Sequence, residues 1–140
     1  MKKNSRKLHG YQTTNRAKHN LKIHLILVCK YRKKLLVQGI EDNIKNIIRD
    51  IEVNSDFDII EMETDIDHIH LMIQYIPRVS ISAIVNRIKS ISTKRIWKLH
   101  QEFLQKHFWK EKTFWTDGYF VCSVGEASPE TIRKYIQNQG

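Results

Sequence analysis

The sequence has only two cysteines and no long hydrophobic run. These two features argue against a disulfide-rich secreted protein and against a membrane-spanning protein. Cys29 and Cys122 are the two cysteines among 140 residues, and they follow no disulfide or metal-binding pattern. No apolar run approaches the length of a membrane-spanning helix, and no hydrophobic stretch follows the basic N-terminus to make a secretory signal. These absences predict a cytoplasmic protein with reduced thiols and no association with a membrane.

Acidic residues are missing from residues 1–40, which contain eleven Lys or Arg. Because the remainder has thirteen Lys or Arg and fifteen Asp or Glu, the net charge of +9 originates in this first segment. Residues 78–112 are basic again, with nine Lys or Arg and two acids, whereas residues 41–67 hold ten acids and two bases. Such segregation favours a polyanion as the partner, nucleic acid above all. A solvated basic tail is the alternative.

Hydrophobic periodicity predicts one α+β domain over residues 1–140, with no linker and no internal repeat. Residues 1–19 show no periodicity and are predicted to form a basic N-terminal arm. The order strand, helix, strand, strand, helix, strand, helix is typical of a ferredoxin-like antiparallel sheet, with helices packed on one face and a further C-terminal helix. The predicted strands are 21–28, 57–64, 68–75 and 118–125. The first predicted helix is 41–53, the second begins at a cap on Ser80 or Ser82, and the last begins at a cap on Ser128.

The stretch DIDHIHLMIQY, residues 65–75, places two histidines one residue apart in an apolar strand. Side chains two apart in a strand share a face, so His68 and His70 point together to the side opposite the better core face. Two neutral imidazoles on a rigid strand can both reach a divalent metal, and Asp67 can orient one of them. Two hydrogen-bonded histidines on a half-buried sheet face are the alternative.

Tyr135 lies in the last predicted helix, on one face with Gln139 four residues further on. Tyrosine can act as a covalent nucleophile when a cation or a base helps its phenol to lose the proton. A boundary aromatic residue whose hydroxyl reaches water is the alternative.

Basic and aromatic residues are interleaved after the first strand and along the second helix. Proteins that hold single strands and hairpins bind phosphates with cations and stack bases on aromatic rings. Most of the aromatic residues at 97–115 are predicted to belong to the core. The predicted nucleic-acid contacts are Lys30, Tyr31, Arg32, Lys33, Lys34, Arg87 and Lys94.

Four motifs between His19 and Gln139 together resemble the small single-tyrosine transposases of the HUH superfamily. These are insertion-sequence enzymes that act on single-stranded DNA, and the transposases associated with REP palindromes are their relatives. The motifs are HLILVCKYRKKLL for the first strand and its basic exit, DHIHLMI for the histidine pair, FWTDGYFVCSVG for the late strand and YIQNQ for the tyrosine helix.

The resemblance implies a mechanism, a cofactor and partners. Tyr135 is expected to attack DNA and leave a 5′-phosphotyrosine, and His68, His70 and Gln139 are expected to bind Mg²⁺ or Mn²⁺. The expected DNA partners are the subterminal hairpins at the element ends, which would be bound by a homodimer. No nucleotide cofactor is expected, because the phosphotyrosine conserves the energy of the broken bond.

Other interpretations use the same residues. A domesticated relative that processes palindromic repeats would share the chemistry, whereas a non-catalytic ferredoxin-like module would use Tyr135 and the histidines for structure only. Covalent capture of DNA on a tyrosine separates these two classes. A zinc hydrolase is disfavoured because no convincing further His or Cys ligand lies near the pair.

Overall fold

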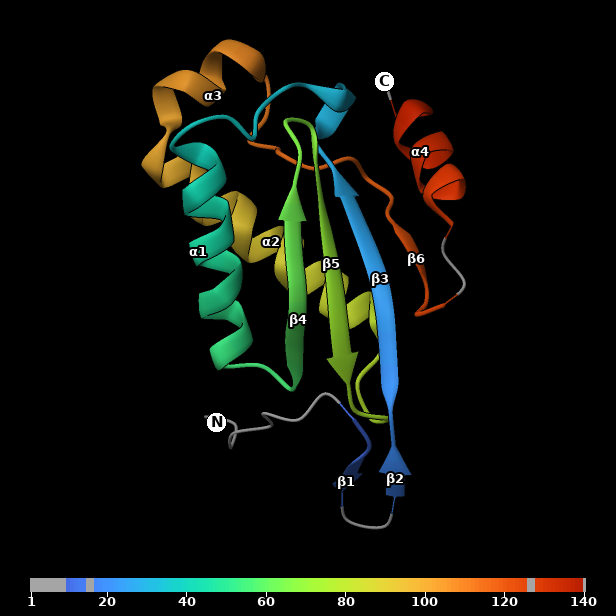
Figure 1. Cartoon of the computed structure of the whole chain (residues 1–140). Helices are drawn as coiled ribbons and strands as arrows, with labels where there is room; N and C mark the ends of the chain where they lie inside the picture. Colours follow the sequence, from blue (N-terminus) through green and yellow to red (C-terminus); the bar gives the residue numbers. More distant parts are fainter. Residues whose placement is uncertain (1–9, 15–16, 126–127, 140) are drawn as a thin grey trace.

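Four antiparallel strands form the central sheet of the computed structural model, which describes residues 10–14, 17–125 and 128–139 (Figure 1). In space the strands follow the order β4-β5-β3-β6, which is the ferredoxin-like arrangement, so the α+β class predicted from the sequence is confirmed. No helix in this described part of the chain is both long and apolar enough to cross a membrane. The strands are β3 (Leu21–Val28), β4 (Phe57–Thr64), β5 (His68–Tyr75) and β6 (Phe120–Ser123).

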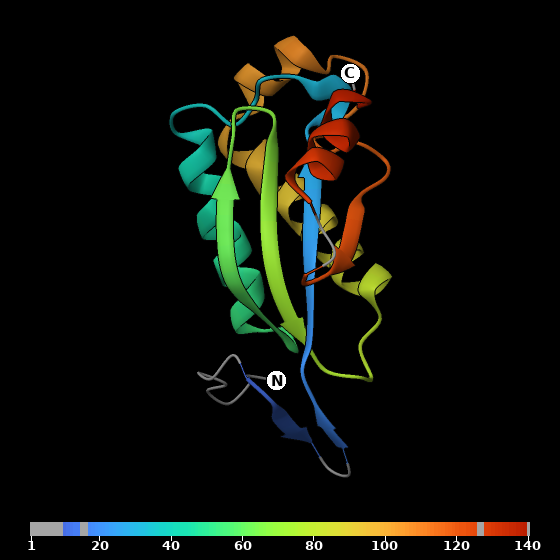
Figure 2. The ribbon, with the colours of Figure 1, turned by 45° about the vertical axis from the view of Figure 1, so that its right-hand side comes forward.

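One face of the sheet packs against α1 (Ile40–Val53) and α2 (Ile81–Leu99), and the core lies between them. The apolar residues of each helix recur at the three- and four-residue spacing that makes one buried stripe. On the opposite face, α4 (Pro129–Gln137) lies over β3 and β6 (Figure 2). The buried side chains between sheet and helices include Leu25, Leu27, Ile44, Ile48, Ile51, Ile69, Leu71, Ile73, Ile84 and Ile88.

Two of the predicted helix caps are present. Ser80 Oγ accepts a hydrogen bond from the Ala83 amide at 3.1 Å, so Ser80 and not Ser82 caps α2. Ser128 Oγ accepts from the Thr131 amide at 3.1 Å and caps α4. Each cap satisfies an amide that the first helical turn would otherwise leave unpaired.

The N-terminal arm was predicted wrongly over its second half. Residues Gln12–Thr14 (β1) and Ala17–His19 (β2) pair as a two-stranded antiparallel sheet, whereas residues 1–9 lie outside the described part. Gln74 of β5 anchors this hairpin, since its buried amide donates to the Gly10 carbonyl at 2.8 Å and to Asn20 at 3.1 Å. Polar side chains dominate these two short strands, so they carry no hydrophobic period.

Three further local features differ from the predictions. The basic exit from β3 forms a 3₁₀ turn (η1, Lys30–Arg32), and a short helix, α3 (Gln101–His107), follows α2. Only Leu104 of α3 is buried, so that helix has too few apolar residues for a periodic signal. Strand β6 is shorter than the predicted 118–125, because the backbone turns at Gly125 with φ of 98°.

Segment 112–118 is part of the connection between α3 and β6, and side-chain hydrogen bonds attach it to α2. The indole of Trp97 donates to the Thr113 carbonyl at 2.8 Å, and the indole of Trp115 donates to Ser92 Oγ at 2.9 Å. Further along, Lys89 binds three successive backbone carbonyls. Since these contacts satisfy buried polar groups, they hold the segment in one position beside α2.

Ser92→Ala is expected to lower the free energy of unfolding by about 1–3 kcal/mol, because it leaves the buried Trp115 N–H without an acceptor. Ser90→Ala on the exposed side of the same helix is the matched control, with an expected change within about 0.5 kcal/mol. Denaturant unfolding followed by tryptophan fluorescence measures both. Equal stability of the two variants would show that the Ser92 hydrogen bond contributes nothing.

Candidate active site and nucleic-acid surface

His68 and His70 lie on the face of β5 that points away from α1 and α2. Both are half-buried, and Ile69 and Leu71 on the other face are buried in the core, as the alternation predicts. His68 Nδ1 lies 2.8 Å from Asp67 Oδ1. Because an ionised carboxylate only accepts hydrogen bonds, Nδ1 carries the hydrogen and Nε2 of His68 keeps a free lone pair.

His24 of β3 is a third imidazole on this face. Its Nδ1 lies 2.8 Å from Nε2 of His70, and the two ring centroids are 4.9 Å apart. Burial lowers the pKa of His70, and the neighbouring His24 lowers it further, against the opposing charges of Glu63 and Glu61. His70 is therefore neutral at neutral pH, but its Nε2 can bind a metal only if His24 releases it.

Helix α4 covers this part of the sheet. A cleft of about 450 Å³ separates the helix from His24 and His70, and none of the described residues of α4 is fully buried. The helix is also tethered at its C-terminal end, where Arg32 bridges Asp67 and the Gln137 carbonyl. The helical residues that line the cleft are Pro129, Ile132, Arg133 and Ile136.

Tyr135 points toward the segment before β6 and does not line that cleft. A Cβ placed on Gly118 would lie 3.9 Å from the Tyr135 hydroxyl, and the ring lies 5.6 Å from that of Phe120. The hydroxyl is buried without a hydrogen-bond partner among the described residues. Burial raises the pKa of the Tyr135 phenol, and the polar side chain of Thr116 nearby offsets part of the rise. The phenol is consequently protonated at neutral pH.

Gln139 lies one turn beyond Tyr135, where its side-chain amide donates to the Tyr135 carbonyl at 3.3 Å. Within residues 10–14, 17–125 and 128–139, no three His, Cys, Asp or Glu side chains are placed to hold a metal ion together. A metal on His68 and His70 would therefore need a ligand of another kind, such as an amide oxygen, water or a phosphate. An amide oxygen beside two imidazoles is a donor set that fits Mg²⁺ or Mn²⁺.

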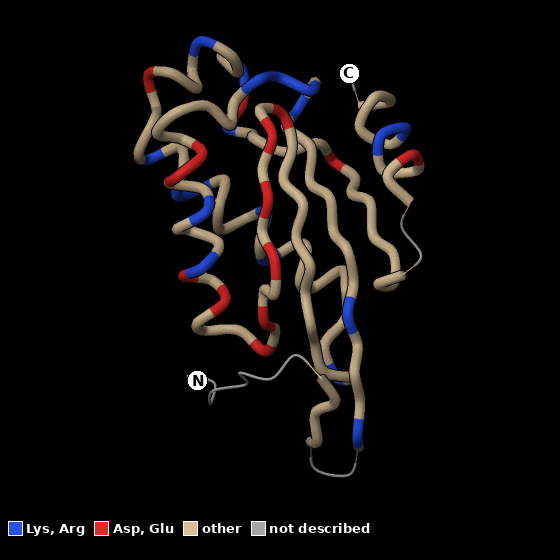
Figure 3. The backbone as a smooth tube through the Cα atoms, in the orientation of Figure 1, with Lys and Arg blue, Asp and Glu red and all other residues tan. Residues whose placement is uncertain are grey.

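The basic exit from β3 places its cations at the end of the sheet near α4. Lys30 pairs with Asp117 at 3.1 Å, Lys33 lies over the ring of Phe108, and Lys34 is exposed. Tyr31 is 63% exposed, although its ring also lies 5.5 Å from the Lys30 ammonium group and 6.5 Å from the Phe108 ring, so its exposed side can stack on a base. In Figure 3 one run of Lys and Arg lies at this end, further ones are spread over the helices and the far end of β3, and acids follow β4.

Arg87 and Lys94 of α2 lie apart from that basic turn. Arg87 is directed to the connection between α1 and β4, where its Nε donates to Ser55 Oγ at 2.8 Å. Lys94 lines a separate groove beside α2. The structure therefore brings the residues from Lys30 to Lys34 together with the C-terminal end of α4, but it does not bring Arg87 to them.

Sequence reasoning missed His24, the position of Gly118 and the role of Lys89, which was counted among the cations for phosphates but binds backbone carbonyls. His24 had a usable signal, because alternation along β3 and its register with β5 place it on the face of His70. Lys89 and Gly118 had none, since their roles depend on where segment 112–118 runs.

Comparison with known proteins places residues 17–139 in the family described as IS200-like transposases. The ISDra2 transposase TnpA of Deinococcus radiodurans is 32% identical over 121 residues, which are 86% of this chain and 85% of that protein. The transposase for insertion sequence element IS200 of Salmonella typhimurium is 27% identical over 120 residues, covering 86% of this chain and 77% of that protein.

Two solved structures share the fold. A Deinococcus radiodurans R1 protein described as a transposase superposes with a TM-score of 0.78 at 28% identity, over 98% of this chain and 97% of that chain. The REP-associated tyrosine transposase bound to a REP hairpin gives a TM-score of 0.54 at 13% identity, over 83% of this chain and 62% of that chain.

Tyr135 is expected to ionise above the ordinary tyrosine pKa of about 10, because burial raises the pKa of its phenol. The folded chain then holds this proton more tightly than the unfolded chain, so the free energy of unfolding falls as pH rises through the unfolded value and beyond. The ultraviolet titration of the wild type minus that of Tyr135→Phe isolates the group. A midpoint equal to that of the urea-unfolded protein would contradict the buried position.

Proposed function

The chain belongs to the IS200-like transposase family, and we propose that it cleaves and rejoins single-stranded DNA with Tyr135 as the nucleophile. As a member of this family it is a DNA-recombining enzyme of the insertion-sequence type. The observation that carries the finer proposal is the position of α4, the helix of Tyr135 and Gln139, over the sheet face that presents His68 and His70.

The proposed cleavage is a transesterification. Tyr135 Oη loses its proton to solvent and attacks a phosphorus atom of the strand, which forms a P–O bond while the bond from phosphorus to the 3′ oxygen breaks. The leaving 3′ oxygen ends as a hydroxyl by taking up a proton, and the 5′ end remains on the tyrosine. Attack of a 3′-hydroxyl on this ester reverses the step and joins DNA, so no nucleotide cofactor is required.

His68, His70 and Gln139 are the residues that would hold Mg²⁺ or Mn²⁺. Such an ion would neutralise charge that develops on the phosphoryl oxygens. Asp67 fixes the His68 ring with Nε2 free, and the lowered pKa of His70 keeps that ring neutral. Gln139 donates to the Tyr135 carbonyl through Nε2, which leaves Oε1 as the atom that would bind the metal.

The Tyr135 side chain has to move away from its position beside Gly118 before it can attack a phosphate held at His68 and His70. Two features support such a movement. The helix buries no residue completely, so its displacement exposes little core surface, and among the described residues the Tyr135 hydroxyl has only the side chain of Thr116 as a polar neighbour to give up. We infer that bound DNA completes the site by drawing α4 across the histidine face.

The DNA partner is proposed to be a hairpin with single-stranded flanks, held by Lys30, Arg32, Lys33 and Lys34, with Tyr31 available for stacking. A solved neighbour of the same fold is bound to a REP hairpin, and the four cations here have the charge for a similar ligand, with Lys34 exposed and Lys30 and Arg32 in ion pairs that DNA would have to compete with. The proposed assembly is a homodimer, which sedimentation at increasing protein concentration tests.

Tyr135→Phe should abolish covalent capture of labelled single-stranded DNA, because only the nucleophilic oxygen is lost. Binding to the same DNA should stay within about twofold, since affinity depends on basic residues elsewhere. Tyr119→Phe serves as the matched control and should still form the adduct. Denaturing gels of the incubated protein measure capture. Adduct formation by Tyr135→Phe would assign the reaction to another tyrosine, and no capture by the wild type would favour the non-catalytic module.

His68→Ala and His70→Ala should each remove cleavage in Mg²⁺ yet leave DNA affinity within about twofold, because phosphate contacts on the basic surface supply affinity. His100→Ala, at the start of α3, is the control. Asp67→Asn should weaken metal affinity or activity by about 10- to 100-fold through loss of the bond that orients His68. EDTA should stop the wild type. Full cleavage by His68→Ala in EDTA would exclude a metal at this site.

A further inference from the structure

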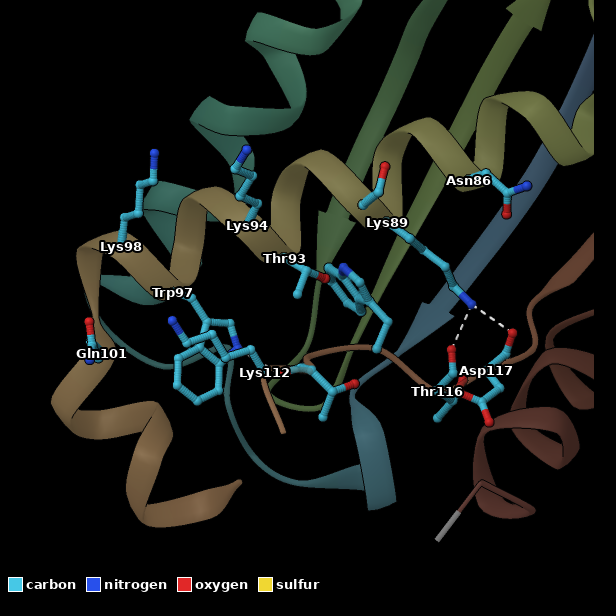
Figure 4. A pocket seen from close by; sticks show the side chains of 13 residues that line it. Asn86, Lys89, Thr93, Lys94, Trp97, Lys98, Gln101, Lys112, Thr116 and Asp117 are labelled. Carbon is cyan, nitrogen blue, oxygen red and sulfur yellow. Dashed lines mark hydrogen bonds between the residues drawn. The ribbon is translucent and has the colours of Figure 1, made fainter. Parts of the chain in front are cut away.

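A groove of about 780 Å³ runs between α2 and segment 112–118, on the helical side of the sheet and apart from the histidine face (Figure 4). Its lining combines four lysines, two tryptophans and several neutral polar side chains. No residue of the proposed catalytic set contributes to it. The residues used below are Lys89, Thr93, Lys94, Lys98, Gln101 and Lys112.

Lys89 closes the inner end of the groove and is occupied there. Its ammonium group donates to the carbonyls of Thr116, Asp117 and Gly118 at 2.6, 2.9 and 2.8 Å. All three of its hydrogens are therefore used, so Lys89 shapes the groove and is not available to a ligand. Asp117 is also engaged, because its carboxylate pairs with Lys30.

Lys94, Lys98 and Lys112 supply cations that no acid of the described residues neutralises. All three are exposed, and none forms an ion pair with another residue of the described chain. The contrast lies on the same helix, where Arg95 pairs with Asp50 at 3.1 Å. In Figure 4 the side chains of Lys94 and Lys98 extend from the rim, away from segment 112–118. A row of unpaired cations along one rim is suited to successive phosphates.

The floor of the groove is suited to a base. Trp97 and Trp115 are each only 4% exposed and their indole N–H groups are bonded inward, so a small apolar edge of each ring borders the groove. Thr93 and Gln101 carry both donors and acceptors that base edges can use. A concave site of this volume can bury a group the size of a small-molecule ligand. The bases of a duplex are stacked inside the double helix, so only unpaired nucleotides can place a base in the groove.

We propose that this groove binds unpaired nucleotides of the DNA strand, with bases inside and phosphates along Lys94 and Lys98. The proposal rests on the proposed function, since it concerns the same DNA. The groove also lies next to the nucleophile, because segment 116–118 forms its inner end and presents Gly118 to the Tyr135 hydroxyl on its other side. A strand in the groove is thus held beside the segment against which Tyr135 rests.

The test compares two hairpins of identical stem, one with single-stranded flanks and one blunt, by fluorescence anisotropy over a range of salt. Lys94→Ala/Lys98→Ala should weaken binding of the flanked hairpin by about tenfold and reduce its salt slope by about 1.4, for two contacts of about 0.7 each. Binding of the blunt hairpin should not change. Lys45→Ala/Arg78→Ala removes the same charge outside the groove and should preserve both affinities.

A second measurement locates the bases. Flanks that carry 5-iodouracil should crosslink under light to peptides from residues 86–101 or 112–118. Crosslinks confined to residues 30–34, or equal losses on the blunt and flanked hairpins, would overturn the groove assignment. Those results would leave the proposed function standing if the wild type still captured DNA covalently. Absence of capture with intact flank binding would instead contradict the proposed function alone.

Discussion

Strands β3 and β5 pair over their full length, with Leu21 opposite Tyr75 and Val28 opposite His68. This register determines what the site contains. Since side chains alternate along both strands, the apolar set that fills the core on one side commits His24, His68 and His70 to the other. A slip of one residue would turn the imidazoles into the core and expose the apolar set, so the hydrophobic core itself holds the candidate ligands in place.

The same constraint explains why α4 is attached so lightly. The sheet already buries one face against α1 and α2, so α4 adds a partial cover on a face that also carries polar groups. A nucleophile on such a helix can rest in one place and react in another at small cost. The unpartnered hydroxyl of Tyr135, seated beside Gly118, is consistent with a resting position. Segment 112–118 links this seat to α2 through Lys89, and so connects the two faces of the sheet.

Much of the fold could be predicted from the sequence because β3, β5, α1 and α2 follow strong hydrophobic periods. The outward direction of His68 and His70 followed from alternation alone. The hairpin of β1 and β2 could not be predicted, since it is anchored by Gln74 from a distant strand. The position of His24 could have been predicted, because alternation along β3 places it on the face of His70 once the two strands pair. The position of Tyr135 required the path of segment 112–118, which depends on tertiary packing that local patterns do not encode.

We propose that His68 and His70 bind a divalent metal and that bound DNA brings Tyr135 to it. Paramagnetic broadening by Mn²⁺ in nuclear magnetic resonance spectra of the Tyr135 and histidine side chains can detect both events. Without DNA, Mn²⁺ should broaden the His68 and His70 ring signals more strongly than those of Tyr135. Addition of a flanked hairpin should extend strong broadening to the Tyr135 ring. If saturating Mn²⁺ left the histidine signals sharp, His68 and His70 would not be metal ligands. If added DNA did not change the broadening of the Tyr135 signal, DNA would not bring Tyr135 to the metal.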